Sequence, residues 1–181
     1  MHQKSSKKFS LMNYLTVALG IIVVLGLVYA LVNYWPAQTS GPQPAQTSDA
    51  AIDKNLEAGE AYMARIAETP GIESLGGGIY YKVLAAGNGP KPTQESRVRV
   101  HYEGRLIDGT VFDSSYQRNE PTTFPVNGVI TGWQIALKAM PVGSTWEVYI
   151  PQYYAYGAKG SGRNIPPYSA LIFKVELLGI E

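Results

Sequence analysis

The chain has 181 residues, a formal net charge of +1 and 16% charged residues. This length accommodates one domain of ordinary size plus additional segments, and the near-neutral charge without a basic stripe argues against nucleic acid as a partner. The absence of cysteine excludes disulfides, cysteine-ligated metals, a cysteine nucleophile and a lipidated cysteine anchor. With 13 tyrosines and three tryptophans against two histidines, aromatic side chains rather than titratable ones are in excess.

An N-terminal apolar stretch is the first predicted element. Residues 15–35 read LTVALGIIVVLGLVYALVNYW, about the ~20 apolar residues that span a hydrocarbon core, and Tyr34-Trp35 lie where an interfacial aromatic belt would be. The lysines of the basic segment 1–14 predict that the N-terminus stays in the cytoplasm. We therefore expect an uncleaved, single-pass transmembrane signal anchor with the rest of the chain outside the cytoplasm. The alternative is a cleaved signal peptide, for which Val28-Tyr29-Ala30 is a poor cleavage site.

A linker and a short helix are predicted next. Residues 36–48, PAQTSGPQPAQTS, are proline and small polar residues that form an extended, partly stiff tether. Residues 49–75 form a short helical neck, in which Asp49 is the predicted N-cap and Pro70-Gly71 ends the helix. Four-three spacing aligns one face of this helix, made of Ile52, Leu56, Gly59, Met63 and Ile66. The face predicts a helix that lies on the following domain; the alternative is a weak homodimer contact, which about two heptads with a glycine cannot support by themselves.

The periodicity typical of strands begins after Gly76-Gly77-Gly78, which we interpret as a hinge at the start of a domain at residues 76–181. Alternating apolar residues predict strands, and three-four spacing predicts a short helix. The strands are placed at Val98–Tyr102, Trp146–Ile150 and Leu171–Leu177, and the helix at Trp133–Met140. Asp108-Gly109 predicts a hairpin turn. The expected fold class is α+β, a curved antiparallel β-sheet wrapped around one short α-helix.

Several enzyme classes lack their characteristic residues in this sequence. His101 lies on the polar face of its predicted strand, and without a second histidine in the domain it does not indicate a metal site or a catalytic triad. No GxSxG nucleophile elbow occurs. The glycines at 76–78 lack the lysine and serine of a phosphate loop. The sequence therefore argues against a conventional hydrolase or phosphoryl-transfer enzyme.

Five stretches of the domain carry a resemblance to a known family. They are VHYEGRLIDGTVFDSS (100–115), VITGW (129–133), MPVGSTWEVYIP (140–151), AYG (155–157) and IPPYSALIFKVELL (165–178). In this order they resemble the FKBP-type peptidyl-prolyl cis-trans isomerases over about residues 76–181. The string MPVGSTWE and the short spacing from Phe124 to Trp133 are most similar to the bacterial Mip-like branch.

The resemblance implies an aromatic pocket for proline with Trp133 as its floor. Its walls would be Tyr102, Phe112, Phe124, Val129, Ile130, Ile165 and Phe173. The catalytic residues would be Tyr102, Asp113 and Tyr156. Arg118 would hold Asp113, the Tyr156 hydroxyl would lie near the substrate carbonyl, and the Ile130 N–H would bind the peptide. Taken singly, the aromatic residues suit an ordinary core and Asp113 suits a turn; only the ordered resemblance favours a site.

The same resemblance implies a function. It predicts a peptidyl-prolyl isomerase that acts on proline-containing polypeptides during the folding of exported proteins and needs no cofactor or metal. The alternative is a non-catalytic proline-binding chaperone or assembly factor. Macrolides of the FK506 and rapamycin type are implied ligands, although Thr122 replaces a common aromatic residue and Ser161 a common histidine at the rim. For a bacterial protein of this kind, the anchor is expected in the inner membrane with the domain facing the periplasm.

Overall fold

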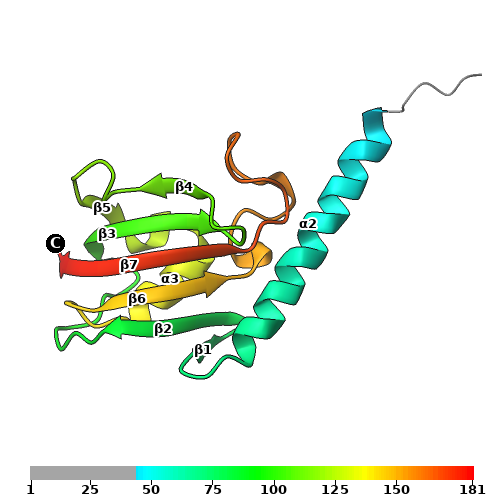
Figure 1. The fold of residues 1–181 in the computed structure, drawn as a ribbon. Helices are drawn as coiled ribbons and strands as arrows, with labels where there is room; N and C mark the ends of the chain where they lie inside the picture. Colours follow the sequence, from blue (N-terminus) through cyan, green and yellow to red (C-terminus); the bar gives the residue numbers. More distant parts are fainter. Residues whose placement is uncertain (1–43) are drawn as a thin grey trace, which may run out of the picture. The chain divides into compact units, whose positions relative to one another are not determined.

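The computed structural model describes residues 44–181, apart from the side chains of residues 44–48 and 53 (Figure 1). The predicted cytoplasmic segment 1–14, the predicted transmembrane anchor 15–35 and linker residues 36–43 lie outside this described part. Among residues 44–181, no helix has the length and apolar character needed to cross a membrane.

A seven-stranded antiparallel sheet forms the body of the described chain. The strands are β1 Glu73–Gly76, β2 Ile79–Ala85, β3 Arg97–Leu106, β4 Val111–Ser114, β5 Thr122–Pro125, β6 Thr145–Ile150 and β7 Leu171–Ile180. Their order is β1-β2-β6-β7-β3-β4, and β5 pairs with β3. The helix α3, Thr131–Ala139, lies across one face of this sheet (Figure 1). The predicted antiparallel sheet with one short helix is therefore confirmed.

Strand periodicity directs one set of side chains towards α3. Successive residues of a strand point to opposite faces, so Val98, Val100 and Tyr102 of β3 reach the same core as alternate residues of β6 and β7. On α3, Trp133 and Leu137 are 5% and 1% exposed. Because burial of one such side chain contributes roughly 1.5–3 kcal/mol, packing of this face of α3 against the sheet stabilises the domain.

The turn between β3 and β4 has the predicted chemistry. Gly109 has φ of 89°, a conformation that glycine adopts without steric cost. The backbone N–H of Thr110 donates to Oδ1 of Asp108 at 2.9 Å. The Asp-Gly hairpin turn is confirmed, and it places β4 beside the half of β3 that carries Tyr102.

The helix α2 begins earlier than predicted. It runs over Pro44–Ala67, so Asp49 lies inside the helix and is not its N-cap, and residues 44–48 are helical rather than an extended linker. Proline tolerates the first turn of a helix because its missing N–H would have no intrahelical partner there. The helix ends just before Pro70-Gly71, as expected.

The helix α2 packs against the face of the sheet opposite to α3. This confirms the prediction that the helix lies on the domain. Met63 packs with Tyr149, Ala170 and Ile172 in a second apolar cluster. Tyr149 and Ile172 point away from α3 because they alternate with core residues of β6 and β7. A homodimer contact through α2 stays untested by this arrangement.

The three glycines at 76–78 form a turn and not a hinge. Gly77 and Gly78 connect β1 to β2 with φ values of 61° and 80°. A Cβ atom on Gly77 would also lie 2.7 Å from the hydroxyl oxygen of Tyr154. The Tyr153 hydroxyl donates to the Gly77 carbonyl at 3.2 Å. The sheet therefore starts at Glu73, three residues before the predicted domain boundary.

Candidate functional site

Five aromatic side chains from four strands and α3 converge on one place. Tyr102, Phe124 and Phe173 lie edge-to-face with Trp133, with ring centroids 5.5, 5.8 and 5.3 Å from the Trp133 ring, and the Phe112 and Phe173 centroids are 5.6 Å apart. Such edge-to-face pairs are each worth about 0.5–1.5 kcal/mol beyond their buried area. The rings therefore hold one another in a fixed arrangement with Trp133 at its centre.

These rings enclose a hollow of about 300 Å³. Its lining consists of Tyr102, Phe112, Asp113, Phe124, Gly128, Val129, Ile130, Trp133, Tyr156 and Phe173. Nine of the eleven residues predicted from the sequence thus line one hollow. Of the other two, Ile165 lines an adjoining hollow of about 290 Å³ together with Phe112, Asp113 and Tyr156, and Arg118 stands behind Asp113. The predicted residues are brought together as expected.

Two glycines of the site were not predicted. Gly128 contributes to the lining of the hollow. Gly104 lies inside β3, and a Cβ atom there would come within 2.5 Å of the Phe112 ring and 2.8 Å of the Phe173 ring. The missing side chain lets these two rings meet over the strand. A glycine inside an otherwise regular strand pattern is the signal that could have revealed it.

A polar network forms one wall of the hollow. The Tyr102 hydroxyl and the Arg118 guanidinium both donate to the Asp113 carboxylate, and Arg118 also donates to the Tyr102 hydroxyl oxygen at 3.1 Å. Burial acts to raise the pKa of Asp113, but the hydrogen bonds and the positive charge of Arg118 outweigh it and hold that pKa below its usual range. Asp113 is therefore an oriented carboxylate at neutral pH.

Tyr156 supplies the other polar group of the hollow. Its ring is 38% exposed, and no hydrogen bond of its hydroxyl is found within residues 44–181. Burial, followed by the charge of Asp113, raises the pKa of Tyr156. The phenol therefore keeps its proton and can donate a hydrogen bond to a ligand.

The Trp133 indole has an unpaired donor. Its Nε1 atom is buried and has no hydrogen-bond partner in the described part of the chain. Buried tryptophan N–H groups in ordinary cores usually find a partner. An orphaned donor at the floor of the hollow is more typical of a binding site than of a purely structural cluster.

The rim of the hollow at Val129-Ile130 is held in place by contacts with α3. The Ile130 carbonyl accepts the N–H groups of Trp133 and Gln134 at 2.9 and 3.1 Å. The Gln134 side chain donates to the Val129 carbonyl at 2.8 Å, a positioning contact that no sequence pattern indicated. No acceptor for the Ile130 N–H is found among residues 44–181, so this donor is available at the rim.

The two rim departures noted in the sequence have structural roles. Thr122 accepts a hydrogen bond of 3.4 Å from Arg118, and Ser161 forms an isolated β-bridge with Ile165.

His101 lies outside the hollow. Its ring stacks on the Tyr116 ring with centroids 4.7 Å apart, and its Nδ1 atom lies 2.9 Å from the Ser115 hydroxyl oxygen. These contacts place the histidine in a structural network.

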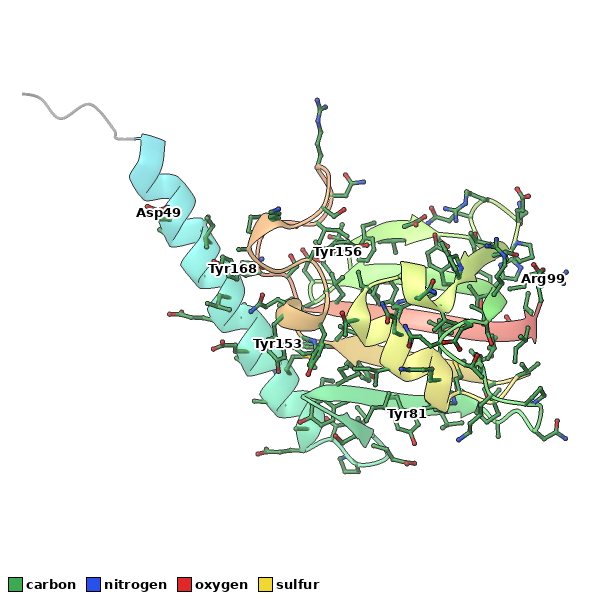
Figure 2. All side chains as sticks on the ribbon, turned by 180° about the vertical axis from the view of Figure 1, so that it is seen from behind. Asp49, Tyr81, Arg99, Tyr153, Tyr156 and Tyr168 are labelled. Carbon is green, nitrogen blue, oxygen red and sulfur yellow. The ribbon has the colours of Figure 1, made fainter. Side chains whose placement is uncertain are left out.

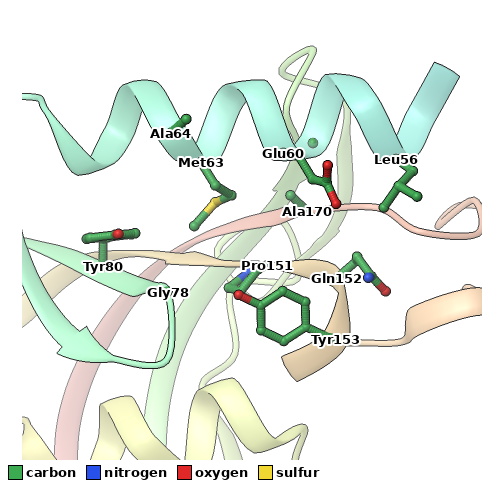
Figure 3. A pocket seen from close by; sticks show the side chains of 11 residues that line it. Leu56, Glu60, Met63, Ala64, Gly78, Tyr80, Pro151, Gln152, Tyr153 and Ala170 are labelled. Carbon is green, nitrogen blue, oxygen red and sulfur yellow. The ribbon is translucent and has the colours of Figure 1, made fainter. Parts of the chain in front are cut away.

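A further hollow of about 280 Å³ lies beneath α2 (Figure 3). Leu56, Met63 and Glu60 line it from the helix, and Pro151 and Tyr153 line it from the opposite side. It contains none of the predicted site residues. Glu60 provides the one carboxylate among the residues that line it, so this hollow offers no paired acidic groups for catalysis.

Comparisons with known proteins identify the family. The family model described as FKBP-type peptidyl-prolyl cis-trans isomerase matches residues 89–178. The chain is 55% identical over 122 residues to the FKBP-type 22 kDa peptidyl-prolyl cis-trans isomerase of Escherichia coli, covering 67% of this chain and 59% of that protein. It is 50% identical over 127 residues to the peptidyl-prolyl cis-trans isomerase Mip of Coxiella burnetii, covering 70% and 55%. The chain thus spans little more than half the length of these two curated relatives.

A crystal structure supports the same relationship. The peptidyl-prolyl cis-trans isomerase of Pseudomonas syringae pv. tomato superposes with a TM-score of 0.68 at 41% sequence identity, covering 72% of this chain and 96% of that one. The two chains therefore share the same fold over most of this chain. The predicted likeness to Mip-type members is confirmed at the level of the family and its relatives.

Proposed function

Because the chain belongs to the FKBP-type peptidyl-prolyl cis-trans isomerases, we propose that its domain accelerates isomerisation of the bond preceding proline in exported polypeptides as they fold. The convergence of Trp133, the surrounding rings and Asp113 on one hollow carries this proposal. A pyrrolidine ring is apolar and compact, and an aromatic floor with aromatic walls binds such a ring by burial and dispersion.

The chemistry that the site has to perform is rotation about a conjugated bond. Amide resonance opposes this rotation with a barrier of ~18–20 kcal/mol, and uncatalysed exchange takes about tens to hundreds of seconds. The planar ground state is charge-separated, with negative density on oxygen, whereas the twisted transition state has lost the conjugation. An environment that disfavours charge separation therefore destabilises the ground state more than the transition state.

The hollow provides such an environment in two ways. Its aromatic lining removes water that would solvate the planar amide. The Asp113 carboxylate, oriented by Tyr102 and Arg118, places negative charge in the wall, where it repels the oxygen of the planar amide more than the less negative oxygen of the twisted one. Both effects lower the barrier without a nucleophile or a covalent intermediate.

The resemblance implies a catalytic role for Tyr156, but on physical grounds we propose that it binds the substrate, as does the Ile130 N–H. A hydrogen bond from the Tyr156 hydroxyl to the substrate carbonyl stabilises the planar state at least as much as the twisted state, so it holds the peptide and does not lower the barrier. The Ile130 N–H at the rim holds the backbone on the other side of the proline. Ile165 closes the adjoining hollow, where a residue next to proline would lie.

Replacement of Tyr156 by phenylalanine should raise KM by about two- to tenfold and leave kcat nearly unchanged. The reason is that one net hydrogen bond contributes roughly 0.5–1.5 kcal/mol and is present in both states. Steady-state kinetics with a proline-containing tetrapeptide measure this separation. A fall in kcat at constant KM would contradict the binding role and assign Tyr156 to the chemical step.

The experiment that tests the function uses the full chain and the same tetrapeptide. Acceleration of cis-to-trans conversion over the uncatalysed rate supports the enzyme. A non-catalytic proline-binding chaperone would use the same hollow, but it would bind unfolded chains and leave the rate unchanged. Retained binding without acceleration would therefore replace the enzyme with the chaperone.

The membrane attachment is proposed from residues 15–35 alone. We expect the uncleaved chain in the inner-membrane fraction, resistant to a high-salt wash and released by detergent, with its domain accessible to protease from the periplasmic side. N-terminal sequencing of the mature protein should find Met1 or His2. A soluble periplasmic form that begins downstream of Ala30 would show instead that the segment is a cleaved signal peptide.

A further inference from the structure

The helix α2 is hydrogen-bonded to the loop that borders the site. This loop, residues 157–170, is called the flap; it follows Tyr156 and ends where β7 begins. The side-chain amide of Asn55 donates to the Pro167 carbonyl and to the Ser169 hydroxyl oxygen, the latter at 3.2 Å. Ser169 is 6% exposed and donates in turn to the Pro166 carbonyl at 2.8 Å. One amide thus holds three residues at the base of the flap, Pro167 and Ser169 directly and Pro166 through Ser169.

Close packing reinforces these hydrogen bonds. Gly59 of α2 is buried, and a Cβ atom there would lie 3.4 Å from the Ala170 Cβ atom. Figure 3 shows Ala170 facing the helix between Leu56 and Met63. Because glycine has no side chain, the helix backbone approaches the end of the flap closely. Asn55 and Gly59 are four residues apart, so both lie on the same face of α2.

The flap is held in a conformation that needs external support. Tyr168 has φ of 58°, a left-handed conformation that is uncommon for residues other than glycine. Its N–H donates to the Gly157 carbonyl at 2.8 Å, which ties the two ends of the flap together. Figure 2 shows Tyr168 next to α2. Such a backbone conformation persists where surrounding contacts impose it.

The supported part of the flap adjoins the substrate hollow. Ile165 lines the adjoining hollow together with Asp113 and Tyr156, which also line the substrate hollow, and it is followed directly by Pro166 and Pro167. The two prolines have fixed φ angles and form a stiff connection. Fixing the Pro167 carbonyl from α2 therefore fixes the position of Ile165 two residues earlier.

We propose that Asn55 is a positioning residue: α2 clamps the flap and thereby sets the substrate affinity of the hollow. This proposal rests on the proposed isomerase function. The helix lies outside residues 89–178, which the family model matches, and it leads back to the linker. Displacement of α2 would release the flap, and a free flap has to be ordered again at each binding event, which raises the apparent dissociation constant.

Two measurements on the full chain test the clamp. Asn55→Ala should raise KM about two- to tenfold at nearly constant kcat, because the lost hydrogen bonds support only the flap. Asn55→Asp keeps the shape but removes the donor, so it should act in the same direction. Hydrogen–deuterium exchange should become faster within residues 157–170 and stay unchanged in β3 and β6. Lys54→Ala, an exposed change on the same helix, is the control.

Gly59→Leu offers an independent variant, with Ala58→Leu as its matched control on the exposed side of α2. The larger side chain at residue 59 should push the helix from Ala170 and reproduce the changes seen with Asn55→Ala. Unchanged flap exchange in both Asn55→Ala and Gly59→Leu would overturn the clamp, and so would faster exchange throughout the domain. If the wild-type chain shows no isomerisation, the proposed function fails, while the exchange data still decide whether α2 holds the flap.

Discussion

Trp133→Leu should lower kcat/KM about 10- to 100-fold. The indole forms the floor of the hollow and contacts three other rings, so its loss removes the surface against which the pyrrolidine ring is buried. Burial of each CH₂ group contributes about 0.8 kcal/mol, and a pyrrolidine ring carries three of them. Leucine keeps the position apolar, which limits the structural damage that alanine would cause.

A second tryptophan provides the matched control for this result. Trp146 is as buried as Trp133, at 5% exposure each, but it stacks on Tyr81 with ring centroids 4.1 Å apart and does not line the hollow. Trp146→Leu should therefore destabilise the domain to a similar degree and leave kcat/KM within about twofold. Urea unfolding of both variants measures their stability. Equal losses of activity in the two variants would mean that Trp133 matters only for folding.

Asp113→Asn should lower kcat about tenfold or more. The substitution keeps the shape of the side chain but removes the negative charge and two charge-assisted hydrogen bonds, each worth roughly 1.5–3 kcal/mol when the partners are well oriented. KM should change less, because the proposed action of the carboxylate is on the difference between planar and twisted amide. Asp108→Asn, in the exposed β3–β4 turn, is the control with the same chemical change.

The pH dependence of kcat in the wild-type chain also tests whether the Asp113 carboxylate acts in turnover. Hydrogen bonds from Tyr102 and Arg118 hold the pKa of Asp113 below its usual range despite the opposing effect of burial. A depressed pKa means that the charged form, and the stability it contributes, is fully present above the unfolded-state pKa and is lost as pH falls through the folded-state pKa. kcat should therefore stay level through the neutral range down to about pH 4. A decline that begins near pH 6 would show that another group controls turnover.

The core strands and α3 were predictable because their core-facing residues recur at a regular spacing. In β3 the buried residues Val98, Val100 and Tyr102 alternate with more exposed ones, and in β7 Phe173, Val175 and Leu177 do the same. The joint position of Tyr102, Asp113 and Trp133 was not predictable from periodicity. It depends on how β3, β4 and α3 meet in space, and only the resemblance of ordered motifs indicated it.

The segments that were predicted wrongly have sequences that are compatible with two different local structures. Proline is compatible with the first turn of a helix as well as with an extended linker. The start of α2 was therefore predicted at Asp49, five residues after its actual start at Pro44. Glycines at 76–78 are compatible with a hinge and with a tight turn. The turn forms because β1 pairs with β2 across these residues, and this pairing cannot be read from the glycines alone. The contact of Asn55 with Pro167 spans 112 residues and has no local signal.

Exchange NMR on a proline-containing tetrapeptide decides whether the hollow isomerises its ligand or only binds it. The peptide is kept at equilibrium with a catalytic amount of the full chain, and magnetisation transfer between its cis and trans signals is followed. We expect exchange signals on the subsecond timescale that disappear with Trp133→Leu and persist with Trp146→Leu. A wild-type chain that binds the peptide but produces no cis–trans exchange signals would contradict the account.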